Sequence, residues 1–132
     1  MNVLVQANVL TVGLGDREQV LRNLPIEITS AQTTVQAARS LKNEKFDSII
    51  SKWNSENINT AAFLQCLRTI KTDISMIVLV KANDPTEEIA ARSIGVSMVL
   101  TEDCSDEFFM QSVISVLGLD VTLPEKVTAP GR

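Results

Sequence analysis

Short β-prone runs alternate with helix-forming segments along almost the whole chain, and this alternation constrains the fold more than any other feature. The β-prone runs centre on residues 3–5, 26–29, 46–50, 76–80 and 96–100. Met76–Val80 is apolar without alternating polar positions, as expected for a parallel strand that is covered on both faces. Alternating β and α units with right-handed crossovers form a parallel sheet with helices on both faces. The chain therefore predicts an α/β fold with a doubly wound, five-stranded parallel sheet.

The segments between these runs carry helix signals. Leucines recur at helical spacing over residues 10–24, and Pro25 ends this first predicted helix. Thr33 or Thr34 can cap the second helix. In Asp84-Pro85-Thr86-Glu87, Asp84 is the expected N-cap and Glu87 would complete a capping box. A loop is expected over residues 54–57, and the last helix is expected to begin at residue 105.

Length and composition limit the class of protein. A chain of 132 residues is long enough for one domain with its own core, and we expect this domain over residues 1–119. Residues 120–132 become polar and proline-containing, and they predict a flexible tail. The net charge of −4 and the scattered Lys and Arg residues argue against nucleic acid as a partner. The longest apolar run, Met76–Val80, is far shorter than the roughly 20 residues that span a membrane.

The inventory of reactive side chains is also restrictive. His is absent, which excludes His general bases and His metal ligands. Cys66 and Cys104 fall in different predicted elements without CxxC spacing, so free thiols in a reducing cytoplasm are expected. We therefore expect no metal, no cofactor and no membrane partner.

The segment Phe46–Asn54 organises the predicted sheet. Its Ile49 and Ile50 form a short buried strand, and polar residues follow from Ser51 onward. Open α/β sheets place their functional sites just beyond the carboxyl ends of the strands. In this strand that position is occupied by Lys52.

Three segments are informative together, namely Phe46–Ser51, Val80–Ala82 and Ile94–Ser97. They resemble the receiver domain of bacterial two-component response regulators, and the resemblance covers about residues 2–118. Phe46–Ser51 is similar to the third-strand pattern of that family, and Val80-Lys81-Ala82 to the end of its fourth strand. Ile94-Gly95-Val96-Ser97, with the strand that follows it to Glu102, is similar to the passage into the fifth strand. The resemblance implies a flavodoxin-like (βα)5 fold with strand order 2-1-3-4-5, and a role in two-component or phosphorelay signal transduction.

A working receiver of this family uses an Asp at the end of the third strand to accept a phosphoryl group. Two acids after the first strand hold Mg²⁺ there. In this chain the acceptor position falls on Lys52, and the acid pair falls within Gln6, Ala7 and Asn8. The first carboxylate in the sequence is Asp16.

The remaining members of the family's site are replaced as well. The Thr or Ser after the fourth strand falls on Lys81, or on Ala82 with a different loop gap, and the Lys-Pro pair after the fifth falls on Glu102-Asp103. The aromatic residue of the fifth strand is replaced by Val99. The resemblance therefore implies a degenerate receiver, or pseudo-receiver, that is not an enzyme and acts through protein–protein interaction without phosphorylation.

Several alternatives stay open at this point. The charges at the strand ends are either solvated or form an inverted ion pair of Lys52 with Glu102 or Asp103, which would contribute ~0.2–1 kcal/mol if exposed. A small-ligand or redox sensor would instead use the emptied pocket, and an apolar cavity near Lys52 and Lys81 would favour it. A working phosphorelay receiver ranks last, because the nearest carboxylate, Asp47, lies at the wrong end of the third strand.

Apolar residues on the last predicted helix indicate a contact face. Phe108, Met110 and Ile114 lie off the stripe that is expected to face the core. In receiver domains the face formed by the fourth helix, fifth strand and fifth helix carries dimer and partner contacts. The resemblance thus implies a protein partner or a homodimer that uses Val99 together with these three residues.

Overall fold

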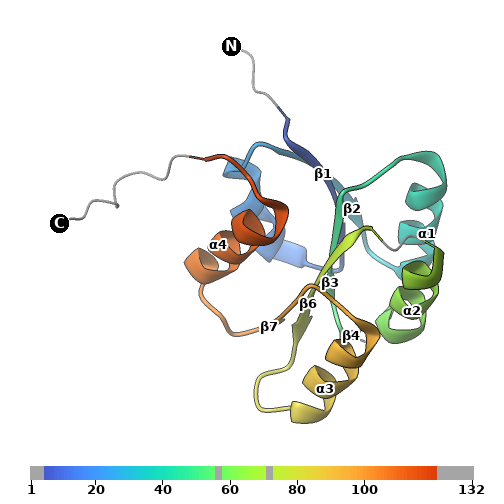
Figure 1. Cartoon of the computed structure of the whole chain (residues 1–132). Helices are drawn as coiled ribbons and strands as arrows, with labels where there is room; N and C mark the ends of the chain where they lie inside the picture. Colours follow the sequence, from blue (N-terminus) through green and yellow to red (C-terminus); the bar gives the residue numbers. More distant parts are fainter. Residues whose placement is uncertain (1–4, 56–57, 71–72, 122–132) are drawn as a thin grey trace.

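A computed structural model describes residues 5–55, 58–70 and 73–121 of the chain. Its main feature is a five-stranded sheet in the order β2-β1-β3-β6-β7, with every neighbouring pair parallel (Figure 1). The strands are β1 (Ala7–Val12), β2 (Ile26–Ala31), β3 (Ser48–Lys52), β6 (Ser75–Val80) and β7 (Met98–Thr101). When only these strands are counted, the order is 2-1-3-4-5, and the predicted flavodoxin-like fold is confirmed.

Helices cover both faces of the sheet (Figure 1). On one face lie the 3₁₀ helix η1 (Gly15–Asn23) and α4 (Asp106–Leu117), which pack over a buried cluster that includes Leu21, Phe109 and Val113. On the other face lie α1 (Thr34–Asn43), α2 (Thr60–Ile70) and α3 (Pro85–Ile94). Their cluster includes Ala37, Leu64 and Ala91. The sheet is therefore buried from both sides, which explains the continuous apolar runs of its central strands.

Most predicted helix ends are confirmed. The Thr33 hydroxyl caps α1 by accepting from the backbone N–H of Gln36, at 3.2 Å. Asp84 caps α3, and Gly95 ends it in the left-handed region at φ +91°. The predicted capping box is wrong, because the Glu87 carboxylate accepts from the backbone N–H of Lys81 instead, at 2.9 Å.

The first strand and helix lie elsewhere than predicted. The strand expected over residues 3–5 is found at Ala7–Val12, and residues 3 and 4 lie outside the described residues. Val9, Leu10 and Val12 are fully buried, because β1 is covered on both faces. A strand buried on both faces shows no alternation of apolar and polar residues. For this reason Leu10 was assigned to the predicted helix together with the leucines that follow it. Gly13, at φ +69°, turns the chain into η1.

Two further features of the architecture complete the fold. Where a loop was expected, β4 (Asn54–Ser55) and β5 (Ile58–Asn59) pair as a small antiparallel hairpin. Near the ends of the domain, the Gln6 side chain donates to the backbone carbonyl of Asp120 at 3.0 Å and accepts from its N–H at 2.8 Å. Within the described ranges, no helix has the length and apolar character needed to cross a membrane.

Candidate functional site

The carboxyl ends of the strands gather most of the predicted site residues at one edge of the sheet. β3 ends at Lys52, β6 is followed by Lys81, and β7 is followed by Glu102 and Asp103. The register aligns these ends, since Lys52 pairs with Leu79 and Val80 pairs with Thr101. Lys52 and Glu102 are half-buried, whereas Lys81 and Asp103 are exposed.

Ala7 and Asn8 do not belong to this edge, and their predicted place in the pocket is wrong. They begin β1, so they lie at the opposite edge of the sheet. There the backbone N–H of Asn8 donates to the Asp47 carboxylate at 2.8 Å. The error comes from placing the first strand too early in the sequence. The residues that follow β1 are Gly13 and Leu14, and neither has a carboxylate.

The predicted ion pair between Lys52 and the carboxylates after β7 is also wrong. The ion pairs of the described part of the chain include Arg17–Asp106, Arg22–Glu18 and Arg92–Glu88, and none of these three involves Lys52. β6 lies between β3 and β7 in the sheet. Two strand spacings separate their backbones by about 10 Å. Asp103 instead accepts a hydrogen bond from the Thr101 hydroxyl at 2.6 Å.

A residue that the sequence analysis missed, Arg17, connects η1 to the segment after β7. Its guanidinium donates to the carbonyl oxygens of Glu102 at 3.1 Å and Ser105 at 3.5 Å. It also donates to the sulfur of Cys104 at 3.4 Å and lies 3.6 Å from the Asp106 carboxylate. The same group stacks over the Phe109 ring, 5.4 Å from its centroid. One cation therefore holds the whole β7–α4 connection.

We expect Arg17→Met to increase amide hydrogen exchange of residues 102–106 several-fold while leaving the sheet protected, because the replacement removes all of these polar contacts but keeps an apolar side chain over Phe109. Hydrogen exchange with mass spectrometry measures this change. Arg92→Met is the matched control, since the Arg92 guanidinium donates to Glu88 one turn away on α3 and lies outside the β7–α4 connection. Equal exchange of the β7–α4 connection in both variants would contradict the role of Arg17.

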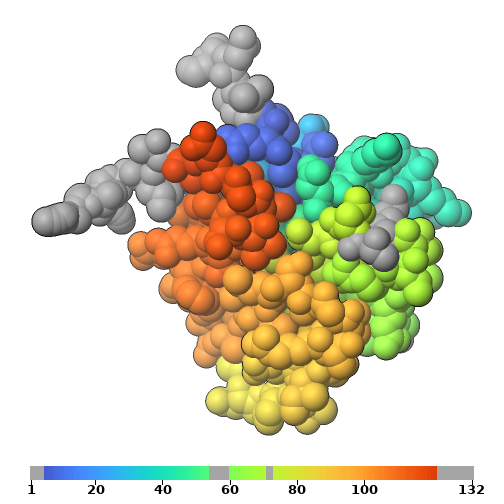
Figure 2. Space-filling model, viewed as in Figure 1, coloured from blue at the N-terminus to red at the C-terminus, as the bar shows by residue number. Residues whose placement is uncertain are grey.

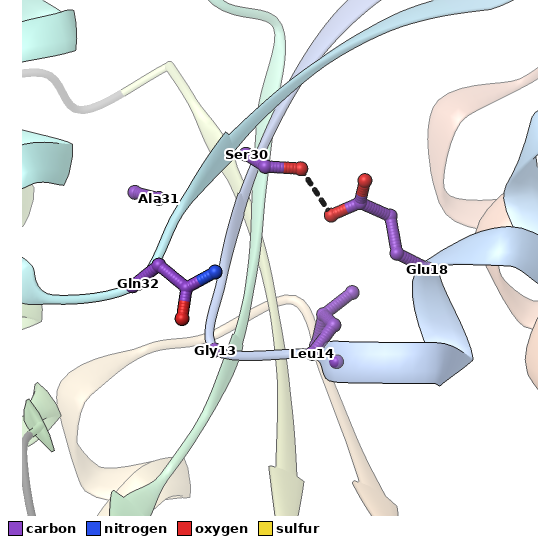
Figure 3. A pocket seen from close by; sticks show the side chains of 7 residues that line it. Gly13, Leu14, Glu18, Ser30, Ala31 and Gln32 are labelled. Carbon is purple, nitrogen blue, oxygen red and sulfur yellow. Dashed lines mark hydrogen bonds between the residues drawn. The ribbon is translucent and has the colours of Figure 1, made fainter.

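A polar cavity of about 360 Å³ lies beside the ends of β1 and β2 (Figure 3). Its lining includes Gly13, Leu14, Glu18, Ser30 and Gln32. Figure 3 shows Glu18 of η1 and Ser30 of β2 pointing toward each other across this space.

The Glu18 carboxylate is buried and has three partners. One oxygen accepts from the hydroxyls of Thr11, at 2.6 Å, and Ser30, at 2.5 Å, and the other accepts from Arg22 at 3.1 Å. η1, with nine residues, is long for a 3₁₀ helix. Most such helices are short because their backbone hydrogen bonds have poor geometry. Glu18 thus attaches η1 to the sheet with side-chain bonds.

Fewer side chains are exposed on the predicted contact face than the sequence analysis expected. Figure 2 shows parts of both α3 and α4 in one view, and the two helices cover opposite faces of the sheet. On α4, Phe108 is 53% exposed, whereas Met110 and Ile114 are half-buried against the cluster around Phe109. Val99 packs against the cluster on the other side of the sheet. Of the four residues, Phe108 is the one with a largely exposed side chain.

Comparison with known proteins finds similarity in structure rather than in sequence. No protein-family model and no curated protein matches the chain. The CheY-like receiver domain of Methanospirillum hungatei JF-1 has 13% identity and a TM-score of 0.75, over 87% of this chain and 94% of that one. The chemotaxis response regulator CheY4 of Vibrio cholerae has 19% identity and a TM-score of 0.73, over 83% of this chain and 98% of that one.

A third similar structure is the signal receiver domain of an HD domain-containing protein from Pseudomonas fluorescens Pf-5. It has 18% identity and a TM-score of 0.76, over 89% of this chain and 92% of that one. At these identities the similarity establishes the fold of response regulator receiver domains.

Proposed function

We propose that this chain is a receiver-like signalling module of the two-component type that works through protein contacts and accepts no phosphoryl group. The fold that it has in common with solved receiver domains supports the signalling role. The proposal that the chain accepts no phosphoryl group rests on Lys52, which lies at the carboxyl end of β3, where receivers have their acceptor Asp. An ammonium group offers no oxygen nucleophile and repels a divalent cation.

The surroundings of Lys52 support the same proposal. Phosphoryl transfer needs cations that neutralise the developing charge, and carboxylates have to hold them. Gly13 and Leu14 follow β1, so no carboxylate side chain extends from the strand end beside Lys52. Glu102 and Asp103 follow β7, on the far side of β6. Among the described residues, Lys52 thus forms no ion pair with these acids.

Arg17 suggests how such a module keeps its shape. Its bonds fix the connection after β7 to η1 from within the protein. The conformation presented to a partner is then set by packing, and no transferred group is required. In this proposal the partner is a signalling or output protein, or a second copy of the chain, that contacts the exposed Phe108 on α4. Free thiols at Cys66 and Cys104 suit a cytoplasmic location.

The small-ligand alternative has weaker support. Neither the cavity beside Glu18 nor the groove described below is lined by Lys52 or Lys81. We therefore keep protein contact as the proposed activity.

Incubation with acetyl phosphate and Mg²⁺ tests the proposal. We expect the intact mass of the protein to stay unchanged, because the acceptor position holds an amine. A receiver domain with an acceptor Asp, treated in parallel, should gain one labile phosphoryl group and serves as the control. A labile gain of the same size in this protein would contradict the proposal, and Asp16 and Asp47 would then be the first residues to replace.

A further inference from the structure

A second surface depression, away from the strand ends, lies between α1 and α2. It has a volume of about 260 Å³, and its lining includes Leu41 and Lys42 of α1 and Phe63, Leu67 and Ile70 of α2. Lys42 is the one residue with a charged side chain in this lining. We call this depression the α1–α2 groove.

The groove is apolar because both helices turn apolar residues toward it at helical spacing. On α2, Phe63, Leu67 and Ile70 follow one another at i, i+4 and i+7. Leu67 is buried in the core, whereas Ile70 is 71% exposed at the rim. On α1, Ala38 and Leu41 line the groove beside Lys42. Large apolar side chains grouped in this way are typical of an interaction site.

The charge of this surface is opposite to that of the whole protein. The chain has 16 acidic and 12 basic residues, yet α1 and α2 contain no Asp or Glu. Their charged residues are Arg39, Lys42 and Arg68; Lys42 lines the groove, whereas the Arg68 guanidinium donates to the carbonyl oxygens of Ile74 and Gly95. The helices α3 and α4, in contrast, carry acids in their first turns, namely Glu87, Glu88, Asp106 and Glu107. A partner of this groove therefore needs apolar side chains flanked by acidic ones.

The dimensions favour a helix as the binding element. Seven residues separate Phe63 from Ile70 on α2, which corresponds to about 10 Å along the axis, or two turns. Helix-in-groove recognition uses apolar anchors at i, i+3 or i+4, and i+7, over the same length. The groove walls are side chains of helices, so an added β-strand would find no backbone edge to pair with.

We propose that the α1–α2 groove binds an amphipathic helix of a partner protein, with an apolar face and acidic flanks. This inference rests on the proposed function, in which the module acts through protein contacts, and it names the chemistry of one partner. The groove and Phe108 lie on opposite faces of the sheet, so they can act separately.

Two designed helical peptides test the proposal. Both carry Leu at i, i+4 and i+7, and the flanking positions are Glu in one peptide and Lys in the other. We expect fluorescence anisotropy to show that the acidic peptide binds at least about tenfold more tightly than the basic one. Ile70→Ser should weaken binding of the acidic peptide by about tenfold, and Lys42→Glu should reduce the preference for it.

The chain offers matched controls for both substitutions. Ile89→Ser replaces an isoleucine of similar exposure, 68%, on α3 outside the groove. Lys81→Glu changes the charge of an exposed lysine away from it. Neither control should change peptide affinity, and thermal melts establish that all variants fold.

Three results would overturn the proposal. The first is equal affinity for the two peptides, and the second is equal affinity of the acidic peptide for wild type and Ile70→Ser. The third is sedimentation of the wild type as a dimer that Ile70→Ser converts to monomer, since a second copy would then occupy the groove. Phosphoryl gain from acetyl phosphate would contradict the proposed function alone, so the two failures are distinguishable.

Discussion

Replacement of Phe109 by alanine is expected to lower the free energy of unfolding by about 3–5 kcal/mol, because a large buried aromatic side chain would leave a cavity. Phe109 is fully buried on the inner side of α4, in one cluster with Leu21 and Ile50. Its ring also supports the Arg17 guanidinium, so the variant should loosen the β7–α4 connection as well. Urea unfolding followed by circular dichroism measures the change.

The adjacent residue provides a control with the same chemical change. Phe108 is 53% exposed, and Phe108→Ala should alter the free energy of unfolding by no more than about 0.5 kcal/mol. If both variants lose stability equally, the orientation of α4 described above is wrong. Phe108→Ala should also weaken any partner or self contact made by α4, which separates binding from folding.

Replacement of Glu18 by alanine is expected to cost about 1–3 kcal/mol of stability. The variant leaves the buried Thr11 hydroxyl without its acceptor and removes the bonds to Ser30 and Arg22. Glu18→Gln keeps an acceptor oxygen and should cost less. The same unfolding experiment measures both variants, with Glu27→Ala, on the exposed side of β2, as the control.

A double-mutant cycle tests whether this cost comes from the hydrogen bond to Thr11. In the Thr11→Val background, Glu18→Ala should be less destabilising than in the wild type, since no buried hydroxyl is then left unpaired. Additive effects of the two replacements would show that the hydroxyl and the carboxylate are not coupled. In that case Glu18 would stabilise η1 through its bonds to Ser30 and Arg22.

Much of the fold could be predicted from the sequence because its signals are local. Asp84 and Gly95 bound α3 with residues whose side chain or backbone freedom suits a helix end. Met76–Val80 is apolar throughout, as in strands that are covered on both faces. The first strand was misplaced because Val9–Val12 carries no alternation and runs directly into helical leucines. The order of the strands followed from the resemblance, and the structure confirms it.

The candidate site was predictable only where it consists of strand ends. Lys52 and Lys81 were expected at one edge of the sheet because a strand's end is visible in the sequence. Arg17 contacts Glu102, which is 85 positions away, and no local pattern connects two such residues. Glu18 of η1 reaches Ser30 of β2, and the helical spacing of the leucines around Glu18 does not show that its carboxylate faces the sheet. Contacts of this kind depend on tertiary packing rather than on periodicity.

The paired hydrogen bonds between Gln6 and Asp120 have a consequence for how the domain can be connected to other proteins. They bring together the two ends of the described range, residues 5–121. A domain whose ends meet can be inserted into a surface loop of a host protein without stretching the host's chain. For the same reason, a short linker could join the two ends, and a circular permutant could be opened at the exposed residues 44 and 45 between α1 and β3.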